Sequence, residues 1–367
     1  MSRSIIVLLM IFFILFLPLK TFAKEDSSDF GLSELYEIIP PEVLELVKSV
    51  DSNVSAEELD KFLNAGNLLK ASLNCCKKAV LTNKENYLCF LFISVALFLY
   101  RAISGSMNER LSGIANIAVI TVSGLSVYTV LESVVKSFSE SFLHVSGFIS
   151  SVASVALASM SASGSGASAV AFGSICSVLI SVFNFVCCYV LIPYVNISLA
   201  LIFSGGITSD SNLLKISSFS KKVCFGVIGS VLSLFFGLMS VQSVIAMGND
   251  SLVKRTMRQV LNNSLPIFGG MLSEGVDTLF IAAVGVKNSA GILGIVSTVL
   301  ISLYPIAELT VCFLFITVIC YLLSFFEGNP ILDFLSGARD VLSVIICVAL
   351  ALTVMTLLLF YFILKVT

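Results

Sequence analysis

Histidine and charged side chains are scarce in this sequence. The 367 residues include one histidine, His144, and only 12% are charged. A single histidine cannot build a histidine-based catalytic triad or a metal site with several histidine ligands. The sequence also lacks a C-x-x-C pair, a phosphate-binding loop ending in Gly-Lys-Ser/Thr, and a nucleophile elbow. These absences argue against a hydrolase, an ATP-driven motor or a structural metal site. We therefore expect no enzymatic activity, metal or cofactor, and no nucleic-acid partner.

Apolar residues dominate the composition. They make up 57% of the chain, and the mean hydropathy is +1.04, far above that of an ordinary soluble protein. Long apolar runs separated by short polar stretches are typical of membrane-spanning helices, because a membrane barrel would show alternating apolar and polar residues over about ten positions. The sequence therefore predicts an all-α, polytopic membrane protein in contact with lipid.

The amino terminus differs from the rest of the chain. Arg3 precedes a short apolar core at residues 5–17, and small residues lead up to Ala23. This pattern predicts a signal peptide at residues 1–23, with a retained anchor as the alternative. Residues 24–86 hold more acids than bases and are expected to form a small helical region outside the cytoplasm. Residues 87–367 form the predicted transmembrane domain.

The transmembrane domain is predicted to hold about seven to nine helices. The expected spans are residues 88–104, 112–131, 142–160, 169–193 with an apolar continuation to 203, 223–247, 265–303, 305–326 and 341–365. The number depends on residues 265–303, which could cross twice or form a re-entrant hairpin. Arg101 and Arg110 place the first loop inside, and two later basic stretches disagree about the middle of the chain.

Cysteine is present but shows no ligand spacing. Most of the ten cysteines lie in apolar runs, where cysteine behaves as a small hydrophobic residue. Cys75 and Cys76 are the two that we expect to contact water. Adjacent cysteines can bond to each other only through a strained ring, so no disulfide framework is predicted.

One predicted span carries a stripe of small residues. Gly226, Ser230, Ser233 and Gly237 recur at spacings of four, three and four, which places them on one helical face. Small residues let membrane helices approach backbone to backbone. The stripe is therefore predicted to be a packing surface, either within the chain or against a partner.

A second apolar segment, residues 268–291, combines charges with five glycines. Charged side chains within a span usually face a bundle interior or a cavity, and broken helices are common in transporters. One interpretation is a polar path lined by Glu274 and Asp277, with Glu308 as a second acid. The other, which we favour, is a packed joint in which Glu274 and Lys287 reach the interface. The candidate residues for function or packing are Pro266, Gly269, Gly270, Ser273, Glu274, Asp277, Lys287, Gly291 and Glu308.

The order of motifs resembles the stage III sporulation protein AE family of endospore-forming bacteria. The motifs are FFGLMSVQSVIA at 235–246, LPIFGGMLSEGVDTL at 265–279, VKNSAGILGI at 286–295 and YPIAEL at 304–309. Between residues 101 and 201 the likeness is mostly compositional.

The resemblance implies a membrane component of the channel complex that links the mother cell to the forespore, in the outer forespore membrane. It also implies partners: a cytoplasmic ATPase, ring-forming bitopic proteins and small membrane proteins. It supplies no catalytic residues. We therefore interpret the chain as a nonenzymatic subunit of an export apparatus needed for forespore development. The alternative is an ion- or solute-coupled transporter that uses Glu274, Asp277 and Glu308.

Overall fold

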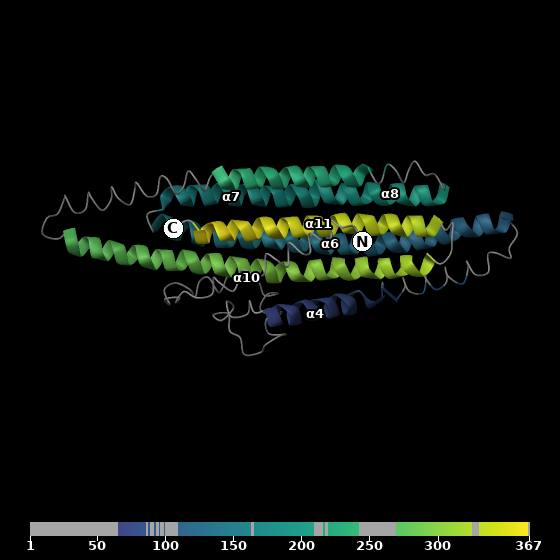
Figure 1. The fold of residues 1–367 in the computed structure, drawn as a ribbon, viewed down its shortest axis with the longest axis horizontal. Coiled ribbons are helices and arrows are strands. Elements are labelled where there is room, and N and C mark those ends of the chain that lie inside the picture. The colour runs from purple at the N-terminus through teal and green to yellow at the C-terminus, as the bar shows by residue number, and fades with distance from the viewer. Residues whose placement is uncertain are drawn as a thin grey trace.

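The computed structural model is a bundle of long helices lying side by side (Figure 1). It describes residues 65–85, 87–88, 109–162, 165–208, 219–241, 269–324 and 330–365, with a few isolated residues between 92 and 99 and residue 216. Within residues 269–290 only the backbone is described. No strand occurs in these residues, so the predicted all-α class is confirmed.

The helices differ widely in length. In chain order they are α4 (Ala65–Thr82), α6 (Glu109–Ala162), α7 (Gly166–Asn184), the π-helical turn η3 (Phe185–Leu191), α8 (Ile192–Thr208), a peripheral helix (Phe219–Val241), α10 (Gly269–Leu323) and α11 (Pro330–Lys365). At 1.5 Å per residue, the 54 residues of α6 extend over about 80 Å. The hydrocarbon core of a bilayer is only about 30 Å thick, so α6 must extend beyond it.

Five helical stretches of the described residues are long and apolar enough to cross a membrane. They are Gly124–Ala162, Gly166–Gly205, Phe219–Val241, Gly291–Leu323 and Phe334–Leu364. The predicted polytopic helical membrane protein is therefore confirmed. The predicted signal peptide and the acidic residues before Ala65 lie outside the described residues.

The carboxyl-terminal helix α11 is the centre of the bundle. Its apolar part is the most buried of the five stretches, and α10, α8, α7 and α6 all contact it. Helices α10 and α11 run antiparallel, since Gly291 lies next to Leu364 and Gly294 next to Phe360. The absence of a side chain at these glycines lets the two helices approach closely. The packing of α10 on α11 forms the main seam of the core.

Helix α6 joins two stretches that the sequence predicts as separate spans. It continues without a break through residues 132–141, the charged stretch that the sequence predicts as a loop between the two spans. Glu132, Lys136 and Glu140 are exposed and four residues apart, while Phe138 faces the core. Charges on one face are compatible with a helix, because the opposite face still buries apolar side chains.

Helix α10 is likewise continuous where the sequence predicts an interruption. The glycine-containing segment from Gly269 is neither broken nor re-entrant, and the helix continues through Pro305 to Leu323. Relative to alanine, a glycine in a helix interior lowers helix stability by only about 1 kcal/mol, so these glycines need not interrupt the helix. The one irregular turn in the described spans is η3, just before Pro193; a π turn accommodates a proline that has no N–H to donate.

Candidate functional site: a buried carboxylate where three helices meet

Glu308 is the charged residue that the bundle buries. Its side chain is 3% exposed, and every other acid or base among the described side chains is partly or fully exposed. Its Oε1 accepts a hydrogen bond from Asn83 Nδ2 at 2.7 Å, and its Oε2 accepts one from Ser137 Oγ at 2.8 Å. Asn83 directly follows α4, Ser137 belongs to α6, and Glu308 belongs to α10. The carboxylate therefore ties three helices together.

A regular spacing on the amino-terminal helix delivers Asn83 to the site. Ala71, Cys75, Ala79, Asn83 and Tyr87 are all buried and follow one another at intervals of four residues. Helical hydrogen bonds from the Asn83 and Tyr87 amides continue the helix past Thr82. The small residues pack on α10, on the side of it away from α7 and α8 (Figure 1). A polar residue on this face must therefore meet α10.

Aromatic side chains make contacts on both sides of this junction along α10. The ring of Tyr87 lies 5.1 Å from that of Phe315, and the Lys78 ammonium lies 5.8 Å from the centre of the Tyr304 ring. Tyr304 and Phe315 lie on either side of Glu308 in α10. The amino-terminal helix therefore runs parallel to α10 through this region.

Cys75 corrects the expectation that both adjacent cysteines contact water. Its side chain is fully buried, whereas Cys76 is partly exposed. Burial raises the pKa of the Cys75 thiol to about 11. The error arises because hydropathy does not identify which face of an amphipathic helix packs.

The three acids proposed for a transport path, Glu274, Asp277 and Glu308, do not lie close together within one chain. Asp277 precedes Glu308 by 31 residues in the uninterrupted helix α10, a separation of about 46 Å. Glu274 lies still farther away. A single site holding all three carboxylates is therefore wrong for this fold.

The remaining candidates of the glycine-containing segment are placed only in part. Gly269, Gly270, Ser273, Glu274, Asp277 and Lys287 belong to the first half of α10, but their side chains lie outside the described residues, as does Pro266 altogether. Gly291 is buried at the α10–α11 seam, where an added Cβ would lie 2.8 Å from a methyl carbon of Leu364. Gly291 therefore packs closely against α11, while the packed joint of the preceding residues stays a prediction.

The small-residue stripe of the peripheral helix faces away from the bundle. Gly226, Ser230, Ser233 and Gly237 are exposed, and no described atom lies within 4 Å of a Cβ added at either glycine. Among the described residues, the stripe therefore has no packing partner. Glycines that do pack internally include Gly124, Gly291, Gly294 and Gly337, where an added Cβ would meet Phe203, Leu364, Phe360 and Ile202.

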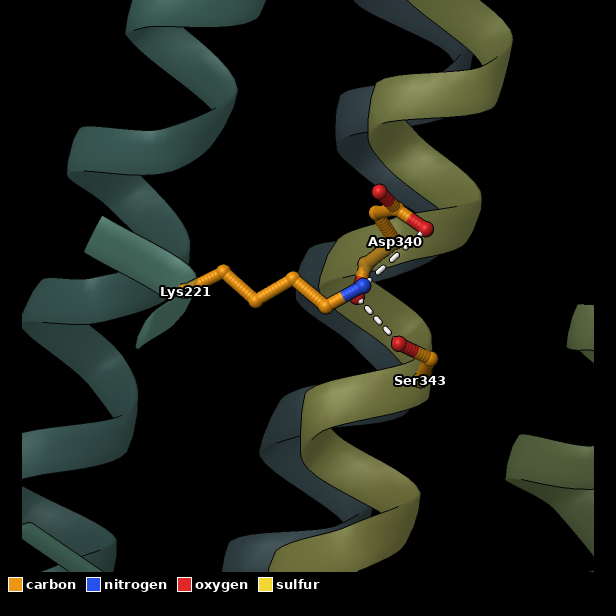
Figure 2. A network of polar contacts seen from close by, with 3 residues as sticks. All are labelled: Lys221, Asp340 and Ser343. Carbon is orange, nitrogen blue, oxygen red and sulfur yellow. Dashed lines mark hydrogen bonds and ion pairs between the residues drawn. The ribbon is translucent and has the colours of Figure 1, made fainter. Parts of the chain in front are cut away.

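An ion pair attaches the peripheral helix to α11. Lys221 Nζ lies 3.2 Å from Asp340 Oδ1, and Ser343 Oγ donates to the Asp340 carbonyl (Figure 2). Asp340 is about half exposed, so the pair is partly solvated. It orients the first turn of the peripheral helix.

The described residues contain no group of three or more histidine, cysteine or acidic side chains that could hold a metal ion. Their nine cysteines are all free thiols. The chemistry of the site is therefore that of one carboxylate held by an amide and a hydroxyl. Sequence reasoning found Glu308 but missed Asn83 and Tyr87, which the four-residue spacing could have revealed. It also missed Ser137, for which the sequence gives no signal.

Comparison with known proteins adds the family. Residues 45–367 match the stage III sporulation protein AE family. A relative from Bacillus subtilis (strain 168), named stage III sporulation protein AE, is 25% identical over 223 residues, which cover 60% of this chain and 55% of the relative. The chain thus matches about half the length of that relative. No solved structure matches. Because the family match covers most of the residues, the chain belongs to the stage III sporulation protein AE family.

Proposed function

We propose that the protein is a nonenzymatic membrane subunit of a channel or export apparatus that links mother cell and forespore and is needed for late forespore development. Membership of a stage III sporulation family, over residues 45–367, is the observation that carries this proposal. The helical membrane fold is consistent with such a role. The buried site is consistent with it too, because Glu308 is held by neutral side chains at a joint between helices.

The outward face of the peripheral helix supports the assignment of a subunit. It presents small residues that permit close helix packing, and none of the described residues packs against its two glycines. The proposed neighbours are a cytoplasmic ATPase, ring-forming bitopic proteins and small membrane proteins of the same complex. A neighbouring membrane helix is the partner that fits this face.

The proposed location is the mother-cell-derived outer forespore membrane. In this arrangement the signal peptide, residues 1–23, is removed, residues 24–86 lie outside the cytoplasm and residues 87–367 form the membrane domain. The contact of α4 with α10 supports a close association between the end of the acidic region and the bundle.

Gene deletion with complementation tests the function. We expect the deletion to stop sporulation after engulfment, and a tagged copy to restore spores and to co-purify with other sporulation-stage membrane proteins. Normal spore counts in the deletion strain would contradict the sporulation role. Full complementation by a copy that co-purifies with none of these proteins would contradict the role as a subunit.

A further inference from the structure

The Glu308 junction has a chemical property that a structural joint does not need. A buried carboxylate loses its hydration, and hydrogen bonds from neutral donors restore only part of that loss. Apolar residues, or a neutral pair such as asparagine and serine, would join the helices without a charge. The position of the acid in the interior therefore requires an explanation of its own.

No described cation pairs with Glu308. The amide of Asn83 and the hydroxyl of Ser137 bond to it, and Tyr304 and Cys312 lie one helical turn before and after it in α10. Lys78, the basic residue of α4 at this junction, stands over the ring of Tyr304. The carboxylate is thus surrounded by neutral polar groups from the three helices.

One further polar group at the junction has no protein partner. The hydroxyl of Tyr87 is buried and has no hydrogen-bond partner among the described atoms. Buried hydroxyls nearly always have a partner. Tyr87 lies one helical turn beyond Asn83, which bonds to Glu308. A carboxylate without a described counter-charge and an unpartnered hydroxyl on the next turn of the docked helix together indicate that a small ligand completes the site.

We propose that Glu308, Asn83, Ser137 and Tyr87 form a binding site for one small monovalent metal cation, with sodium as the candidate, at the junction of α4, α6 and α10. The four side chains offer oxygen atoms and one negative charge, which match a single positive charge. The Asn83 amide presents its oxygen after a half rotation of its terminal group. A calcium ion needs six to eight oxygen ligands and usually several carboxylates, and the described residues contain no second acid at this point.

The site has a mechanical consequence. Asn83 is the polar anchor of the amino-terminal helix, whose other buried residues on this face are small, apart from the ring of Tyr87. Binding of the cation stabilises the arrangement in which this helix is docked on α10. Loss of the cation leaves an uncompensated charge between the helices and favours their separation.

Purified full-length protein in detergent tests the proposal in two arms. The first arm measures binding of radioactive sodium, and the second measures the midpoint of thermal unfolding in sodium and in choline at constant pH and ionic strength. We expect about one sodium ion per chain and a higher midpoint in sodium than in choline. Glu308→Gln should remove the rise in midpoint and lower the affinity for sodium at least tenfold. Absence of sodium binding by the natural protein would overturn the proposal.

Two further variants keep the test decisive. Tyr87→Phe removes only the unpartnered hydroxyl and should weaken the same response while leaving the fold intact, even if Glu308→Gln is unstable. Glu140→Gln, on the exposed face of α6, is the matched control and should respond as the natural protein does. Identical sodium responses in the natural protein, Glu308→Gln and Tyr87→Phe would overturn the proposal as well. That result would leave the sporulation role untouched, because the assay contains no partner protein.

Discussion

Two sets of glycines in this molecule have opposite surroundings. At the α10–α11 seam, a Cβ added at Gly294 would overlap the ring of Phe360, and one at Gly291 would press on Leu364. On the peripheral helix, the space beside Gly226, Gly229 and Gly237 is open among the described residues. The residue type is the same, but the first set is already used by the fold. The second set remains available to a partner, which is why we assign the assembly surface to the peripheral helix.

The largest effect is expected at the seam. Gly294→Leu places a branched side chain where the Phe360 ring lies, and overpacking of this size costs about 3 kcal/mol or more. We expect little folded protein in the membrane fraction, measured by quantitative immunoblotting and by size-exclusion chromatography in detergent. A fully folded Gly294→Leu protein would mean that α10 and α11 are not in close contact.

The next effect concerns the polar joint beside that seam. Glu308→Leu leaves the buried Asn83 amide with only its long 3.4 Å bond to the Ala79 carbonyl, which costs about 1–3 kcal/mol, while Ser137 can turn to a carbonyl of its own helix. Glu308→Gln keeps an acceptor for Asn83 and should cost less. The midpoints of thermal unfolding of the two purified variants measure the difference. Equal destabilisation would show that the hydrogen bonds do not hold the joint.

A smaller effect on the stability of the chain is expected at the exposed small-residue stripe of the peripheral helix. Gly226→Leu and Gly237→Leu extend into free space, so the stability of the isolated protein should stay within about 0.5 kcal/mol of its natural value. Co-purification with other sporulation membrane proteins should fall, because the added side chains hold the helices apart. If partners are retained in full, the stripe faces lipid and the contrast with the seam loses its functional meaning.

The smallest effect is expected at the attachment of the peripheral helix. Lys221→Ala removes an ion pair whose acid is about half exposed, and such pairs contribute about 0–1 kcal/mol. We expect normal membrane levels and a slight fall in the midpoint of unfolding. Loss of the folded protein would mean that the peripheral helix depends on this contact far more than its solvation suggests.

Hydropathy predicts the helical class and the membrane location well, because long apolar runs have few other solutions. It predicts the helix ends poorly. Residues 132–141 were expected to separate two spans, yet their charges occupy one exposed face of α6. The glycines of α10 were expected to break a helix that is continuous from Gly269 to Leu323. Local sequence signals thus mark polarity and flexibility, while packing decides whether a helix ends.

The candidate site was predictable only in part. An acid within an apolar run identifies Glu308 without reference to the fold. Its partners come from residues 225 and 171 positions away, and the sequence carries no signal that joins them. The small-residue stripe illustrates the same limit, since its spacing predicts a packing face but not whether the occupant belongs to the chain.

Photo-crosslinking from Ser233 in sporulating cells tests most directly whether the open face binds another subunit. A photoreactive amino acid at this exposed position should give an adduct with another sporulation-stage membrane protein, identified by mass spectrometry, in cells that still form spores. The same probe at Leu314, an exposed apolar position of α10, is the control and should react mainly with lipid. Equal lipid labelling at both positions, with no protein adduct from Ser233 in spore-forming cells, would contradict the assignment of this face as the assembly surface.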